Sequence, residues 1–78
     1  MLPKFTIYGP NASSITVKNV TLYFSYTTCI AFKSNIEQLQ TDINYSRSTN
    51  KHKSLMGIKE WKAISLEDFN HALEMYFT

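Results

Sequence analysis

The chain has 78 residues, of which 44% are hydrophobic, and a formal net charge of +2. This length fits one domain, residues 1–78, and no apolar run approaches the roughly 18 residues that a membrane helix needs. So weak a net charge makes no general case for nucleic-acid binding. Cys29 is the only cysteine, which excludes a disulfide within the chain and a metal site built on cysteines. With no signal-peptide pattern at the N-terminus, we expect a protein of the reducing cytoplasm.

Four segments alternate apolar and polar residues with the period of two that is typical of strands. They are residues 4–8, 15–24, 29–33 and 39–45. Gly9 and Pro10 end the first segment, and residues 26–28 join the second and third as a hairpin. Lys18 and Asn19 leave two interpretations open: a tight turn that splits the second segment, or a bulge within one long strand.

The second half of the chain changes to helical patterns. Alternation stops over residues 46–57, where Thr49 could cap a short helix that Gly57 ends. Residues 58–64 are predicted to be a connector. Over residues 65–77 apolar side chains recur at spacings of three and four, behind a serine and two acids that suit a helix start. We therefore predict an α+β fold, a small antiparallel sheet of three to five strands packed against a C-terminal amphipathic helix.

The predicted core combines one face of each strand with the apolar stripe of the last helix. Aromatic residues make up 14% of the chain, and we assign most phenylalanines to the core and divide the tyrosines between core and surface. The predicted core residues are Phe5, Ile7, Val20, Leu22, Phe24, Ile30, Phe32, Leu66, Phe69, Leu73 and Phe77, with Trp61 partly buried.

No combination of residues predicts catalysis, a metal or a cofactor. His71 lies off the apolar stripe of the last helix, and His52 lies between two lysines that would repel a cation. Nothing near Cys29 in the sequence would lower its pKa, so we expect it to act as a small hydrophobic residue. The two glycines cannot form a phosphate-binding loop. We therefore predict a binding protein that is not an enzyme and takes no cofactor.

A basic segment is the candidate binding site. It has no acidic residue between Arg47 and Lys53, and three tyrosines could supply stacking groups beside it. Such a segment suits phosphate groups, an acidic protein surface, or simple exposure to solvent. The candidate residues are Arg47, Lys51, His52, Lys53, Tyr23, Tyr26 and Tyr45.

Residues 21–32, TLYFSYTTCIAF, resemble the core motif of a small phage-encoded family of uncharacterised proteins. Residues 46–52, SRSTNKH, and residues 66–73 are similar to two later segments of that family. The chain departs from the family pattern at Cys29, where a proline or a small residue is expected. It also departs where Ser48 and Asn50 replace threonine and glycine.

The resemblance covers most of the chain and implies no catalytic residue. It implies a phage or prophage context, and it makes Lys51 and His52 the residues of most interest. Our first hypothesis is therefore an accessory protein that binds a host protein, for example an inhibitor of a bacterial defence system of the anti-CRISPR kind. A nucleic-acid-binding module that uses residues 47–53 is the second. A homo-oligomeric structural protein, paired through an open sheet edge, is the third.

Overall fold

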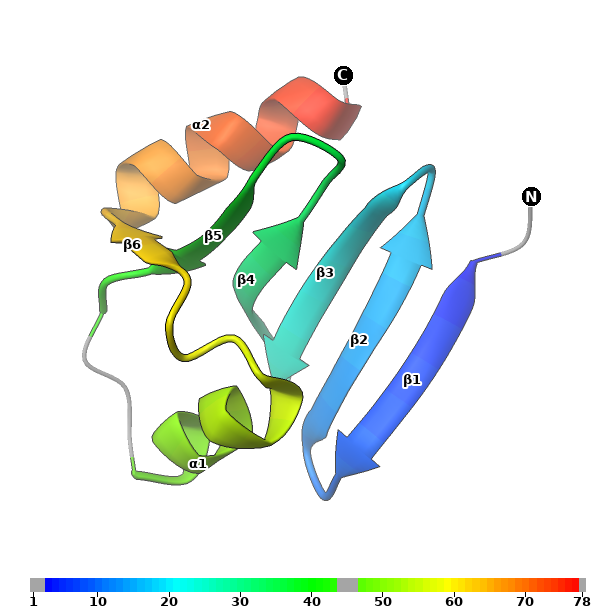
Figure 1. Ribbon diagram of the computed structural model, residues 1–78, viewed down its shortest axis with the longest axis vertical. Coiled ribbons are helices and arrows are strands. Elements are labelled where there is room, and N and C mark those ends of the chain that lie inside the picture. Colours follow the sequence, from blue (N-terminus) through cyan, green and yellow to red (C-terminus); the bar gives the residue numbers. More distant parts are fainter. Residues whose placement is uncertain (1–2, 44–46, 78) are drawn as a thin grey trace.

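The computed structural model describes residues 3–43 and 47–77 as one six-stranded sheet and two helices (Figure 1). The strands are β1 (Lys4–Gly9), β2 (Ala12–Val17), β3 (Val20–Ser25), β4 (Thr28–Lys33), β5 (Gln38–Thr41) and β6 (Lys62–Ile64); the helices are α1 (Arg47–Met56) and α2 (Leu66–Phe77). The strands lie in sequence order across the sheet, and every neighbouring pair is antiparallel except β5 and β6, which are parallel. The α+β class and the packing of the C-terminal helix on the sheet are confirmed.

The prediction of three to five strands was wrong, because the sheet has a sixth strand, β6, while the tight turn that the sequence left open at Lys18 and Asn19 is confirmed. Lys18 and Asn19 form a turn, so the segment from residue 15 to 24 splits into β2 and β3. Both turn residues have positive φ, 52° and 70°, as a type I′ turn requires. The sixth strand lies in the predicted connector, and three residues are too few to show a period.

A bulge in β4 lets this strand serve both faces of the sheet. Tyr23 pairs with Ala31 and Phe24 pairs with Cys29, so Ile30 is an extra residue in the ladder. Ile30 and Ala31 therefore join the cluster on the side of α1, while Phe32 joins the cluster on the side of α2. These three successive residues are all fully buried, with 0% exposure. The prediction that Ile30 and Phe32 share a face was wrong, because the bulge interrupts the alternation.

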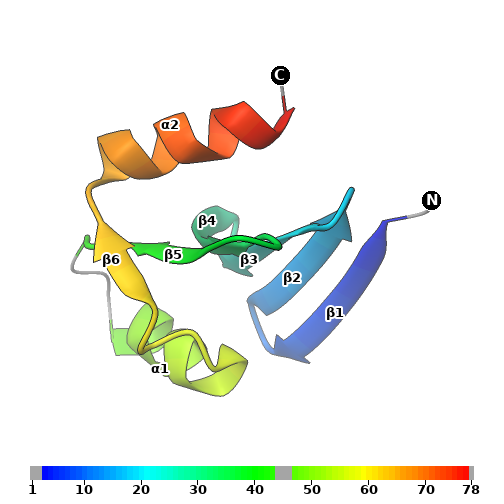
Figure 2. The ribbon, with the colours of Figure 1, turned by 45° about the horizontal axis from the view of Figure 1, so that its top comes forward.

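Two apolar clusters hold the three layers together, one under each helix (Figure 2). Toward α2, the ring of Phe32 lies 5.3 Å from that of Phe69 and 5.6 Å from that of Tyr76, measured between centroids. Toward α1, the rings of Tyr23 and Trp61 meet edge to face at 5.2 Å. Each helix and its flanking segment thus bury part of one face of the sheet.

Part of the predicted core lies at the surface. Phe5 and Ile7 of β1 are 61% and 70% exposed, and Leu66 and Phe77 of α2 are also exposed. The cluster under α2 draws its buried strand residues from β3, β4 and β5, so the helix does not cover the side chains of β1. The alternation in β1 correctly indicates an apolar face, but it does not show that the helix stops short of that strand.

The segment after α1 is held by a helix cap and by a buried amide. The N–H of Ile58 donates to the carbonyl of Lys53 at 3.0 Å, and the N–H of Gly57 donates to that of Ser54 at 3.2 Å, with φ of 74° at Gly57. These are the bonds of a Schellman cap. Nε2 of the buried Gln40 then donates to the carbonyls of Lys59 and Trp61, at 3.0 and 2.7 Å. This amide fixes the connector beside β5, where β6 follows.

Replacing Gly57 by alanine should lower the free energy of unfolding by about 1–2 kcal/mol, because an L side chain in the left-handed region is strained. No atom lies within 4 Å of the added Cβ, so the loss would report backbone strain and not a clash. Thermal unfolding followed by circular dichroism should show a midpoint lower by about 4–8 °C per kcal/mol. Gly57→Asn is the matched control and should lose less; an unchanged midpoint for Gly57→Ala would contradict the cap.

Candidate functional site

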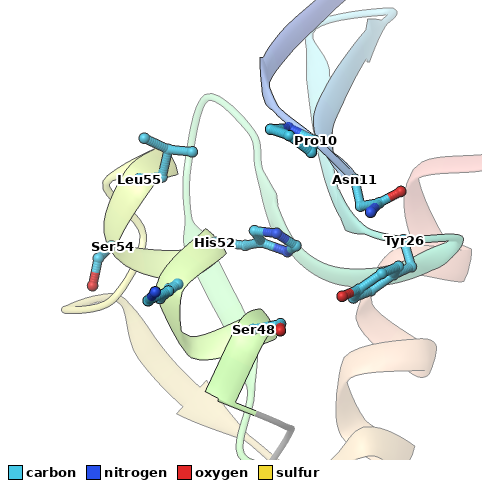
Figure 3. Close-up of a pocket in the computed structure, with 8 residues that line it drawn as sticks. Pro10, Asn11, Tyr26, Ser48, His52, Ser54 and Leu55 are labelled. Atoms are coloured by element: carbon cyan, nitrogen blue, oxygen red, sulfur yellow. The ribbon is translucent and has the colours of Figure 1, made fainter.

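Two hairpin turns and α1 surround an open pocket of about 640 Å³ at one end of the sheet (Figure 3). The β1–β2 turn and the β3–β4 turn form one side, and the exposed face of α1 forms the other. The lining residues are Pro10, Asn11, Tyr26, Ser48, Lys51, His52, Ser54 and Leu55. The pocket therefore combines an aromatic ring and aliphatic side chains with a lysine and a histidine.

The two turns are fixed to each other by a backbone hydrogen bond. The N–H of Tyr26 donates to the carbonyl of Asn11 at 2.7 Å. Asn11 follows Pro10 and has φ of 62°, the combination that a type II turn places at its two central positions. Asparagine tolerates this left-handed backbone better than most residues do. This side of the pocket is therefore held by backbone geometry.

Tyr26 occupies a backbone position where a bulky side chain lowers the stability of the fold. It is the first of the two residues between Ser25 and Thr28, and its φ is 58°. Hairpin turns with positive φ at this position usually have glycine there. A bulky residue in this region costs on the order of 1–3 kcal/mol, and such strain gathers at functional sites. Tyr26 is 52% exposed, and its ring lies 5.6 Å from the ring of His52, so the strained residue places an aromatic side chain on the wall of the pocket.

A buried pair of hydroxyls braces the histidine from behind. Oγ of Ser25 lies 2.7 Å from Nδ1 of His52 and 2.9 Å from Oγ1 of Thr49. Its single proton can serve one of these contacts while the oxygen accepts in the other. Ser25 is only 2% exposed, so its oxygen is not open to a substrate, and the contact ties α1 to the β3–β4 turn. Figure 3 shows the imidazole directed from α1 toward Asn11 and Tyr26.

The structure divides the basic segment between two faces of α1. Arg47 and Lys51 are exposed, and Lys51 lines the pocket. Lys53 is buried with Thr49 and Met56 on the face of the helix toward the sheet. Desolvation by burial lowers the pKa of Lys53. The three cations that the sequence groups together therefore do not form one patch.

The candidate tyrosines are also separated. Tyr26 lies at the pocket, while Tyr23 is buried between Tyr8 and Trp61, at ring distances of 6.3 and 5.2 Å. Tyr45 lies outside the described residues. Of the seven predicted site residues, the pocket brings together three: Tyr26, Lys51 and His52.

Five pocket residues were not predicted from the sequence: Pro10, Asn11, Ser48, Ser54 and Leu55. In the sequence Pro10 and Asn11 indicate only the end of a strand, but the turn that they form places them against α1 at the pocket. Leu55 lies over Gly9, where an added Cβ would be 3.1 Å from its Cδ2. Leu55 nevertheless remains an exposed residue of the pocket. No period in the sequence indicates a contact between α1 and the first hairpin.

Within residues 3–43 and 47–77, no group of three or more His, Cys, Asp or Glu side chains is placed to hold a metal ion. Neither of the two helices described is long and apolar enough to span a bilayer.

Comparison with known proteins gives a family without an assigned activity. A family model described as "Family of unknown function (DUF8033)" matches residues 4–71, which is most of the chain, and the chain belongs to this family. No curated protein and no solved structure matches it. The case for a function therefore depends on the pocket.

Replacing Tyr26 by glycine should raise the thermal midpoint, because glycine adopts the positive φ without the penalty that the aromatic residue incurs. The expected gain is on the order of 1 kcal/mol, part of the 1–3 kcal/mol cost of such strain. Thermal unfolding would measure it, with Tyr26→Phe as the matched control that keeps both ring and strain. A midpoint that falls in the glycine variant would show that the ring stabilises the fold.

Cys29 should react slowly with a disulfide reagent such as DTNB at pH 8. Burial raises the pKa of its thiol to about 11, so roughly one molecule in a thousand carries the reactive thiolate at that pH. The chain in denaturant is the control, and its reaction should be faster by at least tenfold. Native and denatured chains that react at the same rate would contradict the burial of Cys29.

Proposed function

We propose that this protein is a binding module, and not an enzyme, whose pocket takes an apolar side chain from an acidic surface of another protein. The observation that carries the proposal is the strained position of Tyr26. A residue that costs stability and remains about half exposed is better explained by a binding role than by packing. Tyrosine is also among the residues that most often dominate binding energy at protein interfaces.

The charge around the pocket supports an acidic partner. From Arg47 to Lys59 the chain carries four lysine or arginine residues and no acid. Arg47 and Lys51 lie exposed on α1, where they can steer a negatively charged surface toward the pocket. The acids Glu67 and Asp68 begin α2, on the other face of the sheet. The two helices thus present opposite charge.

The resemblance to a phage-encoded family supports a host protein as the partner, in the cytoplasm of a bacterial cell. Its most concrete form is an inhibitor of a defence system, of the anti-CRISPR kind, that works by occupying a surface of its target. This step rests on the resemblance and not on a catalytic site. It predicts a stoichiometric complex that survives nuclease treatment.

Nucleic acid is the second candidate, because Arg47 and Lys51 also suit phosphate contacts. The burial of Lys53 leaves this candidate with fewer exposed cations than the sequence indicates. It predicts an affinity that falls steeply with salt, as counterions are released.

A pull-down from bacterial lysate with the tagged protein, run with and without nuclease, tests the proposal. We expect one protein partner that remains bound after nuclease and is lost with Tyr26→Gly, which removes the ring while relieving strain. Lys51→Glu should weaken capture at least tenfold through charge repulsion. Lys33→Glu makes the same change at an exposed lysine in β4, away from the pocket, and is the matched control.

The variants separate the outcomes. Capture that Tyr26→Gly leaves unchanged would place the interface elsewhere and overturn the proposal. Capture that vanishes with nuclease, and is lost in both Lys51→Glu and Arg47→Glu, would instead support nucleic-acid binding. Equal losses for Lys51→Glu and Lys33→Glu would show that net charge and not the pocket governs capture.

A further inference from the structure

The two edges of the sheet differ in how well they are protected. β6 forms one edge with only three residues, two of which, Lys62 and Ala63, are exposed. β1 forms the other edge with six residues, and it carries the exposed side chains of Phe5 and Ile7. Natural sheets usually blunt an edge by keeping the strand short or placing charges on it. β1 is long for an edge strand and apolar at its centre.

We propose that β1 pairs with β1 of a second copy of the chain, antiparallel about a twofold axis at Thr6, so that the two sheets become one. This surface is distinct from the pocket, and the proposal does not depend on the function argued above.

The register shows which backbone groups of β1 face outward. The two-residue turn between Val17 and Val20 is closed by a hydrogen-bonded pair, and such pairs alternate along an antiparallel ladder. The alternate residues of β2, Ser14 and Thr16, therefore bond in the other direction, toward β1. Ser14 pairs with Thr6 of β1, and Thr16 pairs with Lys4.

Before the bulge near Tyr8, the residues of β1 that bond to β2 are thus Lys4 and Thr6. The N–H and C=O groups of Phe5 and Ile7, which alternate with them, point away from the sheet. Each of these two residues offers one donor and one acceptor at the open edge. The edge is therefore ready to add a strand at its two most apolar positions.

A twofold axis at Thr6 brings compatible side chains together. Phe5 meets the partner's Ile7, Thr6 meets the partner's Thr6, and Lys4 meets the partner's Tyr8. Aromatic residues opposite β-branched ones, and threonine opposite threonine, are favourable cross-strand pairs, and no like charges lie directly opposite each other. The same axis places the outward groups of Phe5 against those of the partner's Ile7, so backbone and side chains agree on one register.

This self-complementarity is the reason to choose a second copy over another partner. The five residues from Lys4 to Tyr8 read as polar, apolar, threonine, apolar, polar, which is symmetric about Thr6. A twofold interface requires such a patch, since each residue must suit its own image. Pairing would also shield Phe5 and Ile7, which the chain alone leaves mostly exposed.

Sedimentation equilibrium over concentrations up to about 1 mM should give the wild-type chain twice its monomer mass at the upper end. Ile7→Lys should shift the dissociation constant upward by at least tenfold, because it places a charge in the joined strands. Ile36→Lys makes the same substitution at an isoleucine that is 82% exposed in the β4–β5 turn, and it should leave the dimer intact. A wild-type chain that stays monomeric, or a dimer that Ile7→Lys does not weaken, would overturn the proposal.

A cysteine trap tests the register itself, in a Cys29→Ala background. Thr6→Cys would place two cysteines opposite each other at the axis, within the Cα separation that a disulfide allows, so mild oxidation should link the chains. In Lys4→Cys the two cysteines would lie four residue steps apart, about 13 Å, and should not link. Linkage of Lys4→Cys in place of Thr6→Cys would contradict the register, and circular dichroism of both variants would check that they fold.

Discussion

The arrangement of this molecule depends on β4, which must be apolar on both of its faces. The sheet is covered by α1 on one side and α2 on the other, and each cluster takes buried residues from this strand. A regular strand would place Ile30 and Phe32 on the same face. The bulge at Ile30 changes the phase, so that Ile30 and Ala31 face α1 while Phe32 faces α2. Three successive buried residues thereby hold together a three-layer domain whose size leaves little other core.

The end of the sheet at which the chain turns from β3 into β4 also forms one side of the pocket. Ser25, the last residue of β3, is buried against Thr49 and His52, and this contact fixes α1 over the turn. The next residue, Tyr26, then leaves the sheet with a left-handed backbone and bonds to Asn11 of the first hairpin. The hydrogen-bonded residue, Ser25, and the strained residue, Tyr26, are therefore neighbours in the chain. A hydrogen-bonded brace at one residue allows the next to keep a conformation that it would not adopt alone.

The sequence predicts the elements that carry a complete local signal. In α2, apolar residues recur at helical spacing and an N-cap residue precedes the helix. The N–H of Asp68 donates to Oγ of Ser65 at 3.2 Å, as an N-cap serine allows. The strands with clear alternation were also found. The predictions that were wrong concern features that depend on contacts between distant parts of the chain. β6 is held beside β5 by Gln40, and Phe5 is exposed because α2 does not reach β1. The prediction that Lys53 shares a basic site with Arg47 and Lys51 did not take the helical period into account. In the helix, Lys53 lies on the face toward the sheet, beside Thr49 and Met56.

The two proposed surfaces are compatible because β1 joins them. Gly9 ends this strand and leads into Pro10 and Asn11, which line the pocket, while the open edge lies along its preceding residues. Antiparallel pairing about Thr6 would point the two copies of Gly9 in opposite directions, so the two pockets would lie at opposite ends of the joined sheet. The axis of such a pairing is perpendicular to the sheet, which keeps both copies of α1 on the same face. A dimer of this kind would offer two separate basic sites to two partner molecules, without either one covering the other.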